Sequence, residues 1–196
     1  MNFFRAGIFS LAALFIFQNA ALALSVTYDQ KVSIGGQPVA TSKVVYKDKK
    51  MRADTNIGGM TVVKLRNEKG SYNYFPDQKA AQKIPPSLDE VDAIQDYPSY
   101  IDYLEKNQGK KVGSEKVDGK ETDIYTFTEP NHRSEAKAWV WREQTFPLKV
   151  QVNSPDGLAV VELSNINFAP NIDGAVFQLA PGTQVTDLGT DSNASS

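Results

Sequence analysis

Cysteine is absent from the 196-residue chain, and histidine occurs only once. Without cysteine the protein has no disulfide bond, no thiol nucleophile and no thiolate-bound metal. It also cannot be a bacterial lipoprotein, because the lipid of such a protein is attached to a cysteine. A zinc site would need several histidine or cysteine ligands. We therefore expect neither a metal ion nor another cofactor.

Residues suited to catalysis are also few. His132 lies in a predicted loop beside Pro130 and Arg133, with no serine or aspartate at a familiar spacing. A Ser-His-Asp triad is defined by geometry and could still form, but a solvated loop histidine is the simpler interpretation. Carboxylates crowd residues 89–96, where a pair could serve a glycosidase, yet they fit the solvated face of a helix. We expect a protein that is not an enzyme.

The chain has no large excess of positive or negative charge: it contains 21 basic and 23 acidic residues, which gives a net charge of −2. Nucleic-acid binding needs a clustered basic surface, so a nucleic-acid partner is not expected. Lysines gather locally in residues 47–50 and 106–111. These groups fit solvated turns and helix ends, or alternatively a contact with anionic lipid headgroups.

A long apolar run occurs at the N-terminus. Residues 1–5 are positive, residues 6–17 are apolar, and Ala21-Leu22-Ala23 gives a small-x-small cleavage pattern. A membrane anchor is the alternative, but the run is short for a span. We expect a signal peptide over residues 1–23 and a periplasmic location. Residues 24–189 are expected to form one monomeric domain, and residues 190–196 a disordered tail.

Alternation of apolar and polar residues dominates the remaining chain. Val26, Tyr28 and Val32 share one face of a predicted strand, and Gly35-Gly36 ends it. Asp118-Gly119 is a strong hairpin signal. Strands are predicted at residues 25–34, 39–47, 51–55, 60–66, 71–75, 81–84, 110–117, 121–128, 136–142, 146–152 and 158–165, with a less regular element around 176–179. The predicted fold is mainly β (α+β), a curved antiparallel sheet of about ten or eleven strands.

A helical insert over about residues 87–108 interrupts this pattern. Ser87 and Glu90 form a capping box, and Pro98 divides the insert into two helical pieces. Apolar residues follow at helical spacing, namely Leu88, Val91 and Ile94 in the first piece and Tyr97, Tyr100, Ile101 and Leu104 around the second.

Aromatic residues suggest a binding surface. A strongly curved sheet has a concave face too wide for its own side chains to fill, and an insert hinged at Pro98 would make a movable cover. Such an apolar site suits an acyl chain, although each aromatic residue could instead be ordinary core. The candidate residues are the seven apolar insert residues together with Tyr72, Tyr74, Trp139 and Trp141.

The order and spacing of several short motifs resemble the periplasmic lipoprotein-carrier (LolA-like) superfamily, and its uncharacterised outer-membrane lipoprotein-sorting relatives more than the carrier itself. The motifs are Lys50-Met51-Arg52-Ala53-Asp54, Val62-Val63, Tyr72-Asn73-Tyr74-Phe75-Pro76, Gln82-Lys83, Trp139-Val140-Trp141, Phe146-Pro147-Leu148-Lys149 and Asn165-Ile166-Asn167, with Phe177 and Pro181.

This resemblance implies an unclosed half-barrel with a helical lid over a cavity that holds acyl chains. It implies transport of a lipid or an acylated protein in outer-membrane biogenesis. Other relatives are sensor domains, so the alternative is an interaction domain that regulates a membrane-protein partner. Arg52 matches the arginine that helps to hold the carrier lid closed; alternatively it is a surface residue or pairs near Asp54.

Overall fold

The computed structural model describes residues 25–86, 99–130, 133–168 and 170–189. The predicted signal peptide, the predicted tail, His132 and the first piece of the helical insert lie outside the described residues. Within the described ranges, no helix is both long enough and apolar enough to cross a membrane.

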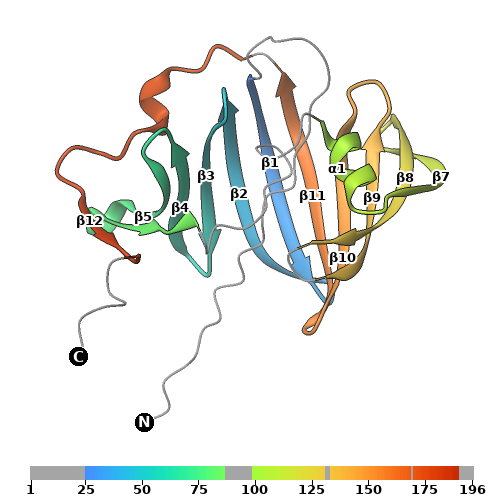
Figure 1. The fold of residues 1–196 in the computed structure, drawn as a ribbon, viewed down its shortest axis with the longest axis horizontal. Coiled ribbons are helices and arrows are strands. Elements are labelled where there is room, and N and C mark those ends of the chain that lie inside the picture. Colours follow the sequence, from blue (N-terminus) through green and yellow to red (C-terminus); the bar gives the residue numbers. More distant parts are fainter. Residues whose placement is uncertain (1–24, 87–98, 131–132, 169, 190–196) are drawn as a thin grey trace.

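Twelve strands form one sheet (Figure 1). They are β1 (Ser25–Ile34), β2 (Gln37–Lys47), β3 (Lys50–Ile57), β4 (Met60–Asn67), β5 (Gly70–Phe75), β6 (Ala80–Ile84), β7 (Lys110–Val117), β8 (Lys120–Glu129), β9 (Ser134–Trp141), β10 (Phe146–Ser154), β11 (Gly157–Phe168) and β12 (Gln184–Asp187). The helix α1 (Tyr100–Lys106) and the 3₁₀ turns η1 (Pro76–Gln78) and η3 (Gly174–Phe177) complete the described elements.

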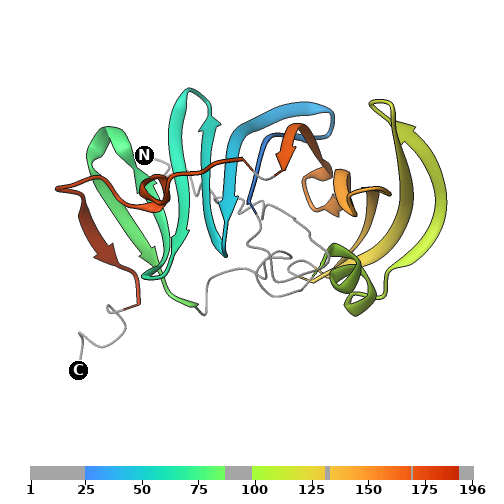
Figure 2. The same cartoon turned by 90° about the horizontal axis from the view of Figure 1, so that it is seen from above.

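The strand order is β12-β6-β5-β4-β3-β2-β1-β11-β10-β9-β8-β7. All neighbours are antiparallel except β12 and β6. The sheet curves strongly and its two edge strands, β12 and β7, do not meet (Figure 2). The predicted mainly β class and the unclosed, curved sheet are confirmed. The irregular element expected around residues 176–179 is η3 with the residues after it, and the last strand comes later, at β12.

Tight turns join most of the strands, as their sequences predict. Both residues of Gly35-Gly36, Gly58-Gly59 and Asp118-Gly119 have positive φ angles, which is the geometry of two-residue hairpin turns that match the strand twist. The β2–β3 turn uses Asp48 and Lys49, with φ angles of 51° and 66°. Aspartate tolerates this region better than most residues, whereas lysine adopts it at a cost.

The sheet has an inner face, which carries α1, and an outer face. The inner cluster joins buried residues of β1–β3 and β8–β11 to the apolar residues of α1. A smaller outer cluster consists of Val63, Leu65, Tyr72, Tyr74 and Ala81, with Leu179 packed against it. Met51 pairs with Arg66 and Arg52 pairs with Leu65; because side chains alternate along a strand, the two clusters occupy opposite faces of β3 and β4.

Candidate functional site

The helix α1 fills part of the inner face with three large side chains. Tyr100, Tyr103 and Leu104 are at most 1% exposed. The Tyr100 and Tyr103 rings stack with centroids 5.3 Å apart, and Tyr103 meets Phe127 of β8 edge-on at 5.7 Å. Such aromatic pairs contribute beyond the area they bury. The described part of the insert is therefore packed onto the sheet by aromatic contacts.

Local signals set the position of α1. Ser99 caps the helix, and its Oγ accepts a hydrogen bond from the Asp102 amide at 3.0 Å. At the other end, the Gly109 amide donates to the Leu104 carbonyl at 2.6 Å, and the Asn107 carbonyl accepts from the Thr128 amide of β8 at 2.9 Å. A Cβ on Gly109 would lie only 2.6 Å from the Leu104 carbonyl oxygen. Glycine is therefore required where the chain leaves α1 for β7.

Tyr100 carries a buried polar group in this region. Its side chain is fully buried, and its hydroxyl has no hydrogen-bond partner in the described part of the chain. Burial raises the pKa of Tyr100 well above its usual value, with a further contribution from Tyr103. Buried hydroxyls normally have a partner, so this one is a natural donor to a ligand or a water molecule.

The structure brings together only some of the predicted site residues. Tyr100 and Leu104 belong to the inner cluster, and Ile101 packs against it. Leu88, Val91, Ile94 and Tyr97 lie outside the described residues. Tyr103, the third tyrosine of the insert, also belongs to the inner cluster. Phe127 and Phe146 line it too, although they were not among the candidates.

Tyr72 and Tyr74 lie on the outer face, away from α1. Tyr72 pairs with Leu65 and Tyr74 with Val63, and all four belong to the outer cluster. The segment after β11 contacts this face: the Asn67 side chain donates to the Phe177 carbonyl at 2.8 Å. Phe177 is fully buried. The two tyrosines therefore pack beneath the chain's C-terminal segment.

Arg52 contacts this C-terminal segment too. Its Nε and Nη2 donate to the carboxylate oxygens of Asp54 at 2.8–3.0 Å, and its Nη1 donates to the Val176 carbonyl at 3.3 Å. Both of these partners lie on the outer face. The alternative interpretation of the sequence placed the partner of Arg52 next to Asp54 rather than at Asp54 itself.

The two tryptophans have different surroundings. Trp139 lies between Ala138 and Val140 of the inner cluster, so its side chain points to the outer face. There Lys137 and Lys149 lie 4.6 and 5.1 Å from its ring centroid, and its Nε1 donates to Glu115.

Trp141 instead approaches the inner cluster. Its ring centroid lies 6.0 Å from that of Phe168, which packs against the inner cluster and meets Phe146 edge-on at 5.5 Å. Lys120 lies 5.3 Å from the Trp141 ring centroid. Of the two tryptophans, Trp141 is the one placed to contact a molecule bound on the inner face.

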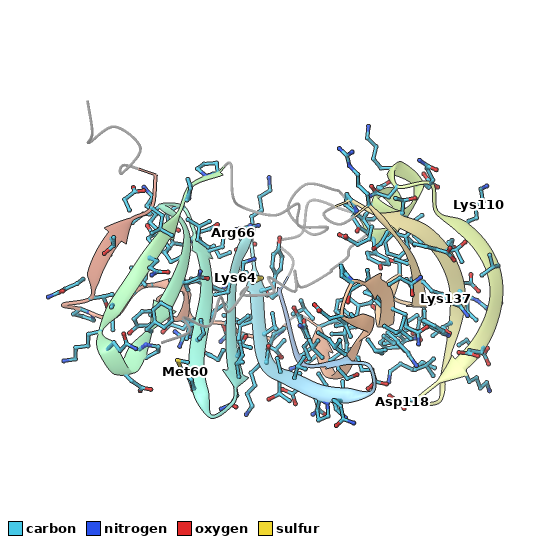
Figure 3. The ribbon with its side chains drawn as sticks, turned by 90° about the horizontal axis from the view of Figure 1, so that it is seen from below. Met60, Lys64, Arg66, Lys110, Asp118 and Lys137 are labelled. Atoms are coloured by element: carbon cyan, nitrogen blue, oxygen red, sulfur yellow. The ribbon has the colours of Figure 1, made fainter. Side chains whose placement is uncertain are left out.

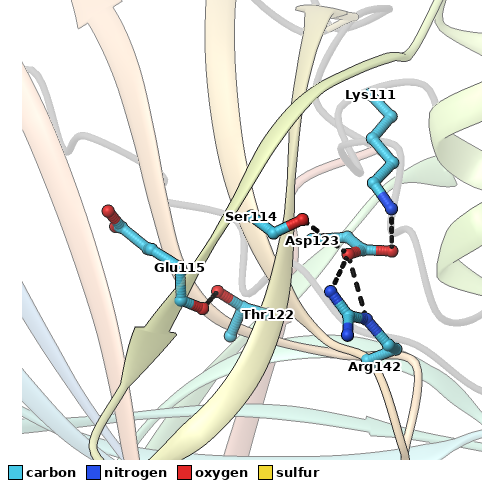
Figure 4. A network of polar contacts seen from close by, with 6 residues as sticks. All are labelled: Lys111, Ser114, Glu115, Thr122, Asp123 and Arg142. Atoms are coloured by element: carbon cyan, nitrogen blue, oxygen red, sulfur yellow. Dashed lines mark hydrogen bonds and ion pairs between the residues drawn. The ribbon is translucent and has the colours of Figure 1, made fainter.

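A polar network lies beside the inner cluster (Figure 4). Asp123 pairs with Val140 and so shares a face with Tyr125 and Phe127. It accepts hydrogen bonds from Arg142 at 2.7 Å and forms an ion pair with Lys111 at 2.8 Å. Burial alone would raise the pKa of Asp123, but the hydrogen bonds of Lys111 and Arg142 lower it below its usual value.

Comparison with solved structures shows a shared fold. An uncharacterized conserved protein from Thermus thermophilus has a TM-score of 0.59 at 10% identity, over 84% of this chain and 90% of that chain. MucB of the Pseudomonas aeruginosa MucA/MucB complex has a TM-score of 0.53 at 15% identity, over 83% of this chain. A second MucB structure, in complex with MucA(peri), has a TM-score of 0.51 at 16% identity.

The chain spans 57–58% of the length of these two MucB chains. No family model matches the sequence, and the search of curated proteins found no relative. Structural neighbours also include a LolA superfamily protein from Nitrosomonas europaea, at a TM-score of 0.38 and 9% identity. The chain therefore shares its fold with the Thermus thermophilus protein and with part of MucB.

Proposed function

We propose that the protein is a periplasmic binding protein that holds the acyl chain of a lipid or lipoprotein against its inner face, with α1 as a movable cover. One observation carries the proposal: a helix of seven residues places three fully buried apolar or aromatic side chains on the inner face of an open sheet. The protein would act by binding and release rather than by catalysis.

A helix this short is marginal on its own, so α1 depends on the contacts of its side chains. Displacing it would uncover Phe127 of the inner cluster, which Tyr103 contacts edge-on. Exposing apolar surface costs roughly 25 cal/mol per Å². An acyl chain taking the place of Tyr103 and Leu104 would cover the same surface, so the free energies of the covered and ligand-bound forms would be similar.

The Tyr100 hydroxyl supports a ligand with a polar group near its chain. In the described part of the chain this buried donor has no partner. An ester or amide carbonyl, as found where acyl chains are attached to lipids and lipoproteins, would accept its hydrogen bond. The predicted leader over residues 1–23 supports a periplasmic location.

Binding can be measured with a fluorescent fatty acid, and native mass spectrometry can detect copurified lipid. We expect uptake by the wild-type protein and greater uptake by Leu104→Ala, because the shortened side chain weakens the hold of α1. Leu188→Ala is the matched control, since Leu188 is 43% exposed. The absence of uptake and of copurified lipid in both wild type and Leu104→Ala would contradict the proposal.

A second candidate is an interaction domain that regulates a membrane-protein partner. The favouring observation is the shared fold with MucB, which was solved in complex with MucA(peri). Photo-crosslinking in cells, from probes placed on the inner face, would then trap one specific membrane protein. Under this alternative, variants that lose fatty-acid binding would still be trapped with the same partner.

A further inference from the structure

Three neighbouring hairpin turns at one end of the sheet are almost free of charge. They join β1 to β2, β3 to β4 and β10 to β11. Residues 33–42 and 55–63, which include the first two turns, contain no Asp, Glu, Lys, Arg or His. Residues 153–159, around the third turn, contain a single charge, on Asp156. We refer to these three turns and their adjoining strand ends as the apolar end.

Strand pairing places the three turns side by side. Ile34 pairs with Ala159, and the Gly35 amide donates to the Leu158 carbonyl at 3.0 Å. Thr41 pairs with Asn56, which brings the β3–β4 turn to the same end. The turns lie along the lower edge of the sheet in Figure 1, and Figure 3 looks at the molecule from that side.

Large apolar side chains are exposed at this end. Val39 is 39% exposed, Ile57 44%, Met60 54% and Leu158 43%. They account for four of the seven exposed large hydrophobic residues among the described residues. Single exposed apolar residues are ordinary, but a group of them on adjoining elements marks an interaction surface.

The opposite end of the same sheet has the reverse character. Its turns contain Asp48 and Lys49, Glu68 and Lys69, and Arg142 and Glu143. The turns at both ends are hairpin turns of one sheet. The geometry of a hairpin turn therefore does not explain why one set is charged and the other is nearly uncharged. The turns that flank the apolar end are also charged, with Asp77 and Lys79 on one side and Arg133 on the other. Of the three central turns, two carry no charge and the third carries only Asp156.

We propose that the apolar end docks on a lipid bilayer, with Val39, Ile57, Met60 and Leu158 inserted among the headgroups and upper acyl chains. These side chains project from separate turns, and a fluid layer can surround each of them, whereas a folded partner would need a matching set of hollows. The apolar end has no lysine or arginine, so the attraction is apolar and needs no anionic lipid. This inference does not depend on the proposed function.

The test is cosedimentation of the exported protein, starting at Leu24, with vesicles of phosphatidylcholine alone. We expect binding that changes little when anionic phosphatidylglycerol or about 0.5 M salt is added, because screening acts on charges. The double variant Ile57→Ser with Met60→Ser should bind about tenfold more weakly. Both residues are exposed, so its thermal unfolding should match that of wild type.

Val112→Ser is the matched control, because Val112 is 55% exposed but lies on the edge strand β7, and it should bind as wild type does. Lack of binding to phosphatidylcholine would overturn the proposal. So would binding that requires anionic lipid and is lost in salt, which would point to the lysines around residues 47–50. Equal losses in the double variant and the control would also overturn it.

Discussion

Arg52 of β3 donates a hydrogen bond to the carbonyl oxygen of Val176, 124 residues later in the chain, at 3.3 Å. The same guanidinium holds the carboxylate of Asp54 from its own strand. Asp54 therefore orients Arg52, and Arg52 fixes the backbone of η3 over the outer cluster. In a similar contact, the Nζ of Lys47 donates a hydrogen bond to the Ile172 carbonyl at 2.8 Å.

Replacing Arg52 with glutamine should loosen the C-terminal segment. We expect a loss of about 1–2 kcal/mol in the free energy of unfolding and faster proteolysis within residues 170–189. Arg142→Gln is the control, because Arg142 also pairs with an aspartate but its side chain is 51% exposed; it should cost less than about 1 kcal/mol. Equal proteolysis of the two variants would mean that Arg52 does not hold this segment.

Gly109→Ala should displace the end of α1. The new Cβ would meet backbone atoms of Leu104 at 2.6–2.8 Å, and backbone atoms cannot give way as a flexible side chain can. We expect a loss of about 1–3 kcal/mol in urea denaturation. At Gly174 a Cβ would meet nothing within 4 Å, so Gly174→Ala should be within about 0.5 kcal/mol of wild type. A harmless Gly109→Ala would show that α1 and β7 separate easily.

Tyr100→Phe should stabilise the protein without ligand. The substitution removes a buried hydroxyl that lacks a partner in the described structure and keeps the stacked ring. Leaving such a group unpaired costs about 1–3 kcal/mol, so the variant should unfold at a higher urea concentration. If the hydroxyl binds an acyl carbonyl, fatty-ester affinity should fall at the same time. A less stable variant would show that the hydroxyl is satisfied in solution.

Asp123 should contribute to stability at neutral pH and lose that contribution in acid. Its pKa is lowered in the folded state, so its contribution is present above the unfolded pKa of about 3.9 and disappears as the pH falls through the folded value. Asp123→Asn should therefore lower stability at pH 7, and the difference from wild type should shrink below about pH 4. A difference that stays constant from about pH 7 to about pH 3 would contradict this.

The two tryptophans should respond differently to substitution. Trp141→Ala should weaken fatty-acid binding severalfold, because its ring meets Phe168 at the margin of the inner cluster. Trp139→Ala should lose stability, by about 3–5 kcal/mol, while the folded fraction binds normally. Titration with the fluorescent fatty acid, combined with urea denaturation, separates the two effects. Equal loss of affinity in both would place Trp139 on the binding surface.

Alternation in the sequence predicted the strands well, because each hairpin turn is a local event. Glycine pairs at residues 35–36 and 58–59 mark turns without reference to the rest of the chain. The strand β12 had no comparable signal. It is four residues long, is largely exposed and pairs in parallel with β6, so neither an alternating pattern nor a tight turn identifies it.

The sequence predicts which residues share one face of the sheet. It does not predict whether that face is the inner or the outer one. Tyr72 and Tyr74 share a face as predicted, but a period of two does not say which face meets α1. That choice depends on the segment containing Phe177 and Leu179, about a hundred residues later, which covers the outer cluster. The same limit applies to Trp139. In α1 the helical stripe was informative because it is local, whereas the cap, Ser99, was not predicted.

The position of β1 means that its pairing is completed late in folding. This strand lies in the middle of the sheet, between β2 and β11, so one of its edges has no partner until residues 157–168 have arrived. A chain that emerges N-terminus first would meanwhile present an open, apolar-faced edge. Pairing across this sequence distance is slow. Efficient folding of this protein should therefore depend on something that shields β1 until the second half of the sheet has formed.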